Sequence, residues 1–241
     1  MMTLFWIGFI SAFVSSMSGT GASLFATPLF LSVGVNLTAI LAFNQISAAI
    51  WTPIASRTYR LTEPLDKKLI AILAGVGVFG VGFGYKLAIF LPPEHFKPII
   101  GSLILMVVVI VWFRPIKPLK REELKGLNFI TLLLAFLLGA YQAFFGAGNA
   151  LFNSLMFNRS QGFDFKRALA HAYACAFVWC SISAILYWMK GWVSWSLVVP
   201  AVAGSILGAT LGSRYGSKLS NTTLKKIFLF GGGLMGVRLL F

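Results

Sequence analysis

Two similar blocks of small residues decide how this sequence folds: Ser18-Gly-Thr-Gly-Ala-Ser-Leu-Phe25 and Phe145-Gly-Ala-Gly-Asn-Ala-Leu-Phe152. Two glycines, a leucine and a phenylalanine occupy the same places in both blocks. Each block follows an apolar run and precedes a shorter one. An alanine-rich run, a glycine-spaced run and a last apolar run then follow in both halves. The sequence therefore indicates an internal repeat.

The composition around these blocks is that of a membrane protein. Of the 241 residues, 58% are hydrophobic and 11% are charged, whereas a soluble domain carries roughly 25% charged residues. Many apolar runs approach the roughly 20 residues that cross a bilayer core as a helix. We expect an all-α integral membrane protein with the lipid bilayer as a partner, no soluble domain and no signal peptide. The net charge of +14 lies in short loops, so no nucleic-acid partner is expected.

The basic residues discriminate between two topologies. If each Gly-x-Gly segment only kinks one crossing helix, each half has four crossings and the basic loops divide almost evenly between the two sides. If the chain reverses there, each half is a broken or re-entrant helical hairpin plus three transmembrane helices. Because three crossings is an odd number, the second half enters the membrane from the side opposite to the first half. This inverted arrangement places 16 of the 20 Lys and Arg residues on one side. The positive-inside rule favours this second arrangement, two inverted-topology repeats.

The predicted boundaries follow from the apolar runs. The first repeat, 1–113, has a hairpin over 2–34 and spans at 37–57, 68–91 and 98–113, and a cytoplasmic linker covers 114–126. The second repeat, 127–241, has a hairpin over 127–158 and spans at 168–189, 192–213 and 224–241. We expect a multi-pass protein of the cell inner (plasma) membrane with both termini outside. A homodimer is a possible assembly.

The hairpin arms are too short to cross the bilayer, so their tips would lie inside it and meet near its midplane. Irregular backbone survives at that depth only where it is buried in protein or lines a wet cavity. Broken helices that meet there form the binding sites of many secondary transporters. At such helix starts, free N–H groups favour an anion. No Asp or Glu lies in any predicted span, which argues against a cation.

The candidate substrate-binding residues come from the two tips and the runs that follow them. No catalytic residue, metal ligand or cofactor motif is evident, and the polar and glycine residues at these positions are Ser18, Gly19, Thr20, Gly21, Asn44, Gln45, Gly146, Gly148, Asn149, Asn153, His171 and Tyr173. Asn44 and His171 are expected to close a cage around a small oxyanion, with His171 coupling export to pH when protonated.

Simpler interpretations accompany these residues. The Gly-x-Gly segments could serve only helix packing. Gly75-Val-Gly-Val-Phe-Gly80 matches G-x-G-x-x-G, but it lies inside an apolar run, so close helix packing is expected there instead of a nucleotide. Trp51 and Trp188 are interpreted as packing residues or interface anchors. Cys175 and Cys180 are expected to be free thiols.

The repeated small-residue signature and the alanine-rich segment after each copy resemble the sulfite exporter TauE/SafE family. The resemblance covers nearly the whole chain and is closer in the second half, at Gly162-Phe-Asp-Phe-Lys-Arg-Ala-Leu-Ala, Lys190-Gly-Trp-Val and the Gly204-x-x-x-Gly-x-x-x-Gly-Ser-Arg stretch. It implies export of small sulfur-containing anions such as sulfite, sulfoacetate or other organosulfonates.

Three functions therefore compete. The first is an anion exporter that works by alternating access, which is a transporter and not an enzyme. The second is a metal-ion or other cation permease, which the lack of carboxylates in the spans disfavours. The third is a non-transporting membrane assembly subunit, for which inverted repeats with reversed helix tips would be an odd construction.

Overall fold

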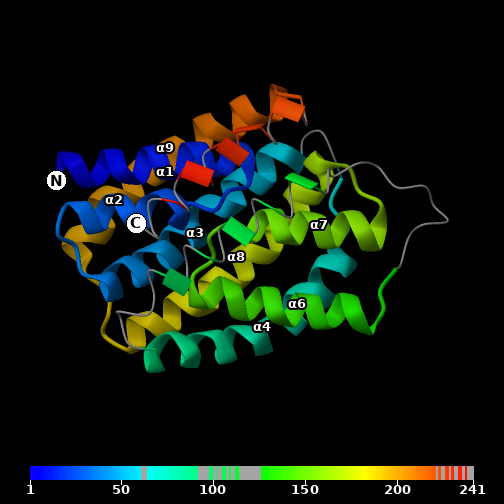
Figure 1. Ribbon diagram of the computed structural model, residues 1–241, viewed down its shortest axis with the longest axis horizontal. Helices are drawn as coiled ribbons and strands as arrows, with labels where there is room; N and C mark the ends of the chain where they lie inside the picture. The colour runs from blue at the N-terminus through cyan, green and yellow to red at the C-terminus, as the bar shows by residue number, and fades with distance from the viewer. Residues whose placement is uncertain are drawn as a thin grey trace.

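The computed structural model describes residues 1–60, 64–91 and 126–220, with scattered positions inside 98–113 and 222–237. These residues form helices and, in the ranges just given, no strand, as the all-α prediction requires (Figure 1). The helices are α1 (Met2–Ser18), α2 (Ser23–Ser32), α3 (Leu37–Arg60), α4 (Lys67–Phe90), α6 (Phe129–Phe144), α7 (Asn149–Gln161), α8 (Phe165–Met189) and α9 (Trp195–Lys218). The predicted spans 98–113 and 224–241 and the linker 114–126 fall largely outside the described residues.

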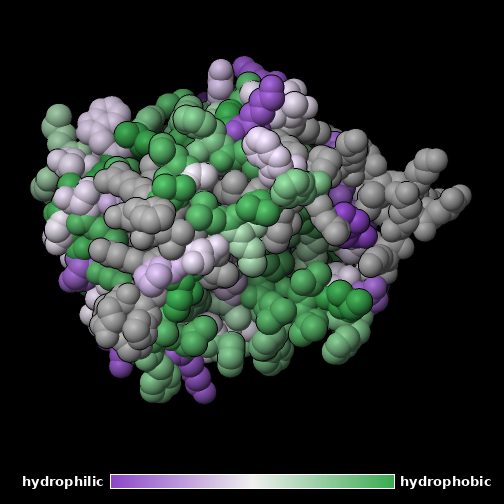
Figure 2. Space-filling model, in the orientation of Figure 1, coloured by the Kyte–Doolittle hydropathy of each residue, from purple (hydrophilic) through white to green (hydrophobic). Residues whose placement is uncertain are grey.

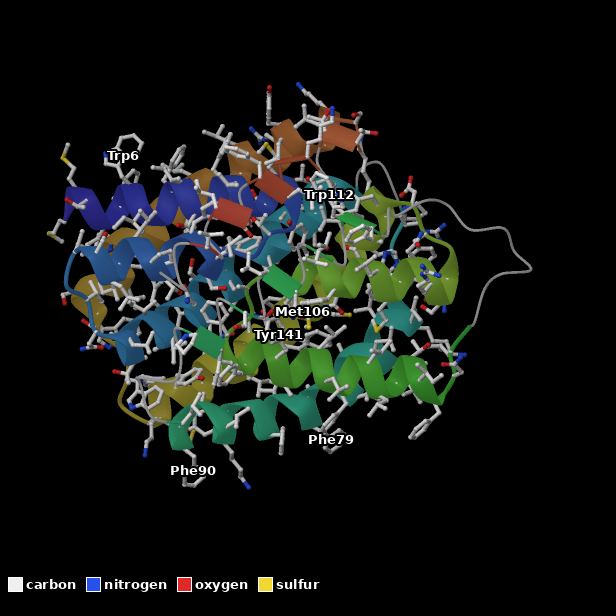
Figure 3. All side chains as sticks on the ribbon, viewed as in Figure 1. Trp6, Phe79, Phe90, Met106, Trp112 and Tyr141 are labelled. Atoms are coloured by element: carbon white, nitrogen blue, oxygen red, sulfur yellow. The ribbon has the colours of Figure 1, made fainter. Side chains whose placement is uncertain are left out.

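Four helices, α3, α4, α8 and α9, are long and apolar enough to cross a membrane. At 1.5 Å per residue, 24 residues reach about 36 Å, more than the roughly 30 Å hydrocarbon core. Many large apolar side chains are exposed, and apolar residues are prominent on the face shown in Figure 2. Trp6 on α1 and Phe79 and Phe90 on α4 point away from the bundle (Figure 3). Such a surface suits lipid, and the chain is a multi-pass membrane protein.

Side chains cap the starts of four of these helices, including α3, where Asn36 Oδ1 accepts the N–H of Ala39 at 2.8 Å. The carboxylate of Asp66 accepts the N–H of Leu69 at the start of α4, at 3.0 Å. Asn128 caps α6 and Asp164 caps α8 in the same way, each at 2.9 Å. A cap of this kind satisfies an N–H group that the first turn leaves free.

Glycines let two pairs of helices approach closely (Figure 1). On α9, Gly204, Gly208 and Gly212 lie directly against the carbonyl groups of α1 residues 5, 9 and 13, where a Cβ atom would clash. On α4, Gly80 and Gly84 lie in the same way against Phe136 and Ala140 of α6. The helix-packing role predicted for the G-x-G-x-x-G stretch is therefore confirmed at Gly80. Residue numbers rise together in both pairs, so α1 is parallel to α9 and α4 is parallel to α6.

Polar contacts give the direction of the two central helices, α3 and α8. Along α3, Ser47 bonds Ser205 of α9 at 2.9 Å, and Thr58 bonds Ser213 at 3.1 Å, so these helices are parallel. The start of α8 instead meets the end of α9, where Lys166 Nζ donates to the Ser217 carbonyl at 2.7 Å. Helix α8 therefore runs opposite to α3 and α9.

Helix α8 runs parallel to α4. Near its start, His171 bonds Asp66, and further along Trp179 bonds the Ala74 carbonyl. Helices α1, α3 and α9 thus share one direction, and α4, α6 and α8 share the other. Corresponding helices of the two halves, such as α3 and α8, run antiparallel.

Candidate functional site

Both Gly-x-Gly segments interrupt a helix, and the chain reverses there (Figure 1). Gly19 and Gly21 have φ of 78° and 76°, and Gly146 and Gly148 have φ of 74° and 71°, a region that L side chains rarely adopt. In the second half, Gly126 N–H bonds the Ser160 carbonyl at 2.9 Å, so the start of α6 lies beside the end of α7. The two helices therefore form an antiparallel hairpin.

The tips of the two hairpins touch. Gly148 N–H donates to the Thr20 carbonyl at 2.6 Å. A Cβ atom on Gly21 would lie 2.7 Å from Gly148 N and 2.8 Å from the Gly146 carbonyl oxygen. Because only glycine leaves room for this approach, the contact between the two matched segments depends on their glycines.

Tyrosines cap the broken helices from within their own half. In the first half, the Tyr59 hydroxyl of α3 donates to the Met17 carbonyl at 2.9 Å. In the second half, the Tyr187 hydroxyl of α8 donates to the Ala143 carbonyl at 2.9 Å. The last carbonyls of a helix have no partner in the helix itself. These hydroxyls supply the hydrogen-bond donors that two such carbonyls would otherwise lack inside the protein.

A second pair of caps crosses between the halves. The Tyr173 hydroxyl of α8 donates to the Ser15 carbonyl of α1 at 2.7 Å. Conversely, Gln45 Nε2 of α3 donates to the Gln142 carbonyl of α6 at 2.8 Å. Each central helix thus holds the broken helix of both its own half and the other half.

A small cavity lies where the tips and the central helices meet. Its volume of about 20 Å³ has room for roughly one water molecule. The residues that line it come from both tips, α3 and α8 and carry no formal charge; within the described residues they are Gly21, Ala22, Ser23, Asn44, Ala48, Trp51, Thr52, Gln142, Phe145, Gly146, Ala150, Tyr173, Ala176 and Cys180.

The first tip offers free donors to this cavity. The backbone N–H groups of residues 20–23 find no acceptor within the part of the chain that the structure describes. Gly21, Ala22 and Ser23 among them line the cavity. They stand at the start of α2, where the helix dipole is positive. This arrangement of neutral donors is suited to an acceptor ligand, above all an anion.

Asn44 is the predicted side chain that fits the site best. It is 6% exposed and lines the cavity. Its Nδ2 donates to Thr27 Oγ1 at 3.1 Å, and its Oδ1 has no partner in the described structure. Because Thr27 can bond either end of the amide, one polar atom of Asn44 stays available to a ligand whichever way the amide is turned.

The other predicted residues divide into two groups. Gly21, Gly146 and Tyr173 also line the cavity, although the Tyr173 hydroxyl is occupied by Ser15. The remaining tip residues and Gln45 are buried without lining the cavity, and they are Ser18, Gly19, Thr20, Gln45, Gly148, Asn149 and Asn153. Several serve the tips themselves: Asn149 Nδ2, for instance, donates to Gln142 Oε1 at 2.6 Å.

The structure does not bring His171 to the cavity. His171 Nε2 accepts the N–H of Asp66 at 2.9 Å, and Nδ1 lies 2.8 Å from the Arg167 carbonyl. The ring packs against Phe157 and Phe163. His171 therefore ties the start of α8 to the start of α4, and the expectation that it closes the cage does not fit this position. A spacing along one helix could not reveal that these contacts turn the ring away.

Several residues that line the cavity are absent from the predicted site, among them Trp51, Gln142 and Thr52. Trp51 was expected to be a packing residue or anchor, and Gln142 and Thr52 were not considered. Gln142 did carry a signal, since it is a glutamine within an apolar run, just before a Gly-x-Gly segment. Thr52 carried no such signal in the sequence, because a buried Thr often bonds its own helix. Here the Thr52 hydroxyl does donate to the Ala48 carbonyl.

Comparison with known proteins gives a consistent result. The family model described as sulfite exporter TauE/SafE matches residues 4–239. A probable membrane transporter protein of Haemophilus influenzae is 27% identical over 206 residues, which cover 85% of this chain and 80% of that protein. The probable membrane transporter protein YfcA of Escherichia coli K12 is 25% identical over 211 residues, covering 85% and 76%. No solved structure matches the chain.

Proposed function

The chain belongs to the sulfite exporter TauE/SafE family and is a membrane transporter, and we propose that it exports a small sulfur-containing oxyanion. Sulfite, sulfoacetate and other organosulfonates are the candidate substrates. The observation that carries the proposal is the row of unpaired N–H groups at residues 20–23, three of which line a cavity between the two hairpin tips. An anion that leaves water needs replacement donors, and this segment supplies several side by side.

Neutral donors suit an anion that must also be released. A buried Lys or Arg would hold an oxyanion through a charge-assisted bond about twice as strong as a neutral one. The described residues that line the cavity instead offer backbone N–H groups, amides and hydroxyls. A site of this kind binds through several moderate hydrogen bonds, which can be broken together when the tips separate.

Alternating access is supported by the arrangement of the helices. Corresponding helices of the halves run antiparallel, and α3 and α8 each hold the broken helices of both halves. We interpret this as two inverted repeats, as the basic loops predict. The cavity of about 20 Å³ is too small for a four-atom oxyanion. Substrate entry therefore requires the tips to separate, which a rocking of one repeat against the other would accomplish.

The substitution Asn44→Asp tests the sign of the ligand charge. It replaces an amide at the cavity with an isosteric carboxylate, so binding of an anion should weaken at least about tenfold through like-charge repulsion. Export of radiolabelled sulfite from proteoliposomes and calorimetric binding of sulfite, thiosulfate and methanesulfonate are the measurements. Asn36→Asp is the matched control, since exposed Asn36 caps α3 and Asp caps equally well.

A cation permease would respond in the opposite way. Asn44→Asp would then preserve or increase the uptake of a cation such as Na⁺ or Mn²⁺. If the wild-type protein binds none of the three oxyanions and Asn44→Asp increases cation uptake, the anion proposal is wrong.

A further inference from the structure

Trp51 carries a buried donor that the protein itself leaves unused. The side chain is 2% exposed, and its Nε1–H has no acceptor in the described structure. A buried tryptophan N–H usually has a partner, because a buried donor without one loses its water and gains nothing in return. Trp51 lines the cavity between the tips, so a ligand held there can supply the missing acceptor.

The second half contains a matching tryptophan that is satisfied. Trp179 of α8 donates from Nε1 to the Ala74 carbonyl at 2.9 Å, and its ring lies directly over Gly77. Trp51 and Trp179 each lie eight residues before the tyrosine that caps the broken helix of their own half, Tyr59 and Tyr187. The two indoles therefore hold corresponding places, and only the one at the cavity lacks an acceptor.

The position of the Trp51 ring is fixed by its neighbour. It makes an edge contact with Tyr173, with ring centroids 5.5 Å apart and planes at 74°, and Tyr173 is itself held by the Ser15 carbonyl. An indole N–H only donates. It can be satisfied by the oxygen of an oxyanion but not by a metal cation or an ammonium group.

We propose that Trp51 is a substrate-binding and specificity-determining residue, whose indole N–H bonds an oxygen of the transported oxyanion opposite the N–H groups of the first tip. This inference rests on the function proposed above. It assigns the site a preference for ligands with two or more exposed anionic oxygens, such as sulfite and the head group of a sulfonate, over halides of similar size. A sulfonate or sulfite can accept from the tip and the indole through different oxygens, and a halide offers one centre.

The test compares Trp51→Phe with Trp179→Phe in detergent-purified protein. Trp51→Phe keeps a ring and removes only the donor, so sulfite and methanesulfonate should bind about ten- to a hundredfold more weakly, the effect of one hydrogen bond to a charged group. Its ligand-free melting temperature should equal or exceed that of the wild type. Trp179→Phe should lower the melting temperature, because it breaks a bond to Ala74, and leave the sulfite affinity of the folded protein unchanged.

A measurement on the wild-type protein keeps the inference testable if Trp51→Phe does not fold. Addition of sulfite should move the indole ¹⁵N–¹H resonance of Trp51 downfield and leave that of Trp179 in place, with assignments from single Phe variants of the other six tryptophans. Wild-type sulfite affinity in a folded Trp51→Phe variant, or an unmoved Trp51 resonance at saturation, would refute the role of Trp51 and leave the proposed function standing. Absence of oxyanion binding by the wild type would refute both.

Discussion

At the scale of single residues, hydrogen bonds from the central helices make the broken helices stable. Tyr59 and Tyr187 occupy corresponding places and cap the broken helix of their own half. Tyr173 and Gln45 cap the helix of the opposite half. An unsatisfied carbonyl inside a membrane protein is costly, so these four donors stabilise the helix ends within the bundle.

Tyr59→Phe and Tyr187→Phe should therefore each destabilise the protein by about 1–3 kcal/mol, because each removes a buried donor and leaves a carbonyl without its partner. Thermal unfolding of purified protein, followed by intrinsic fluorescence, measures the effect. Tyr215→Phe is the control, since Tyr215 is 56% exposed on α9. Equal melting temperatures for all three variants would show that the hydroxyl caps do not stabilise the breaks.

At the scale of helices, the glycine-spaced runs of both halves allow close helix packing, each in a different pair of helices. Glycines of α9 pack on α1, and glycines of α4 pack on α6. Since α1 belongs to the first half and α9 to the second, each broken helix is held by a helix of the other half. Close backbone approach replaces the hydrophobic driving force that helices lack in lipid.

The glycines of α4 provide a matched test. A Cβ atom on Gly84 would clash with the Ala140 carbonyl, whereas one on Gly82 would meet nothing within 4 Å. Gly84→Ala should destabilise the protein by about 1–3 kcal/mol through overpacking, and Gly82→Ala should be neutral or slightly stabilising because alanine favours helix. Fluorescence-detected size-exclusion chromatography after a heat series ranks the variants. A larger loss for Gly82→Ala would contradict the packing.

At the scale of the whole molecule, the helix directions gather basic residues at one end of the bundle. Helices α3 and α9 end there, and α4 and α8 begin there. That end carries Arg57, Arg60, Lys67, Lys166 and Lys218. From the positive-inside rule we propose that this end faces the cytoplasm.

Single-cysteine labelling in whole cells tests this orientation in a variant whose buried Cys175 and Cys180 are replaced by Ser or Ala. Ser196→Cys, exposed near the start of α9, should react with an impermeant maleimide from outside. Lys218→Cys, exposed at the end of the same helix, should react only after the cells are permeabilised. Equal labelling of both in intact cells would rule out the proposed topology.

The sequence by itself determined the membrane class, the internal repeat and the position of the tips. Apolar runs must lie in lipid or be buried in protein, and Gly-x-Gly permits a left-handed backbone whatever packs around it. These signals are local, so they can be read without coordinates. The ends of helices were less certain: α9 starts at Trp195 rather than at 192, because Gly191, with φ of 78°, and the cap residue Ser194 separate it from α8.

Only the tertiary structure decided which polar side chains serve the cavity. His171 and Trp51 both lie on central helices that look equally apolar in sequence, yet His171 is bonded through both ring nitrogens away from the cavity and Trp51 lines it with a free donor. Whether a buried donor is satisfied depends on carbonyl groups far away in the chain, such as Ala74 for Trp179. The physical reason is that hydrogen-bond satisfaction is a property of packed neighbours, whereas helix periodicity fixes only which residues share a face.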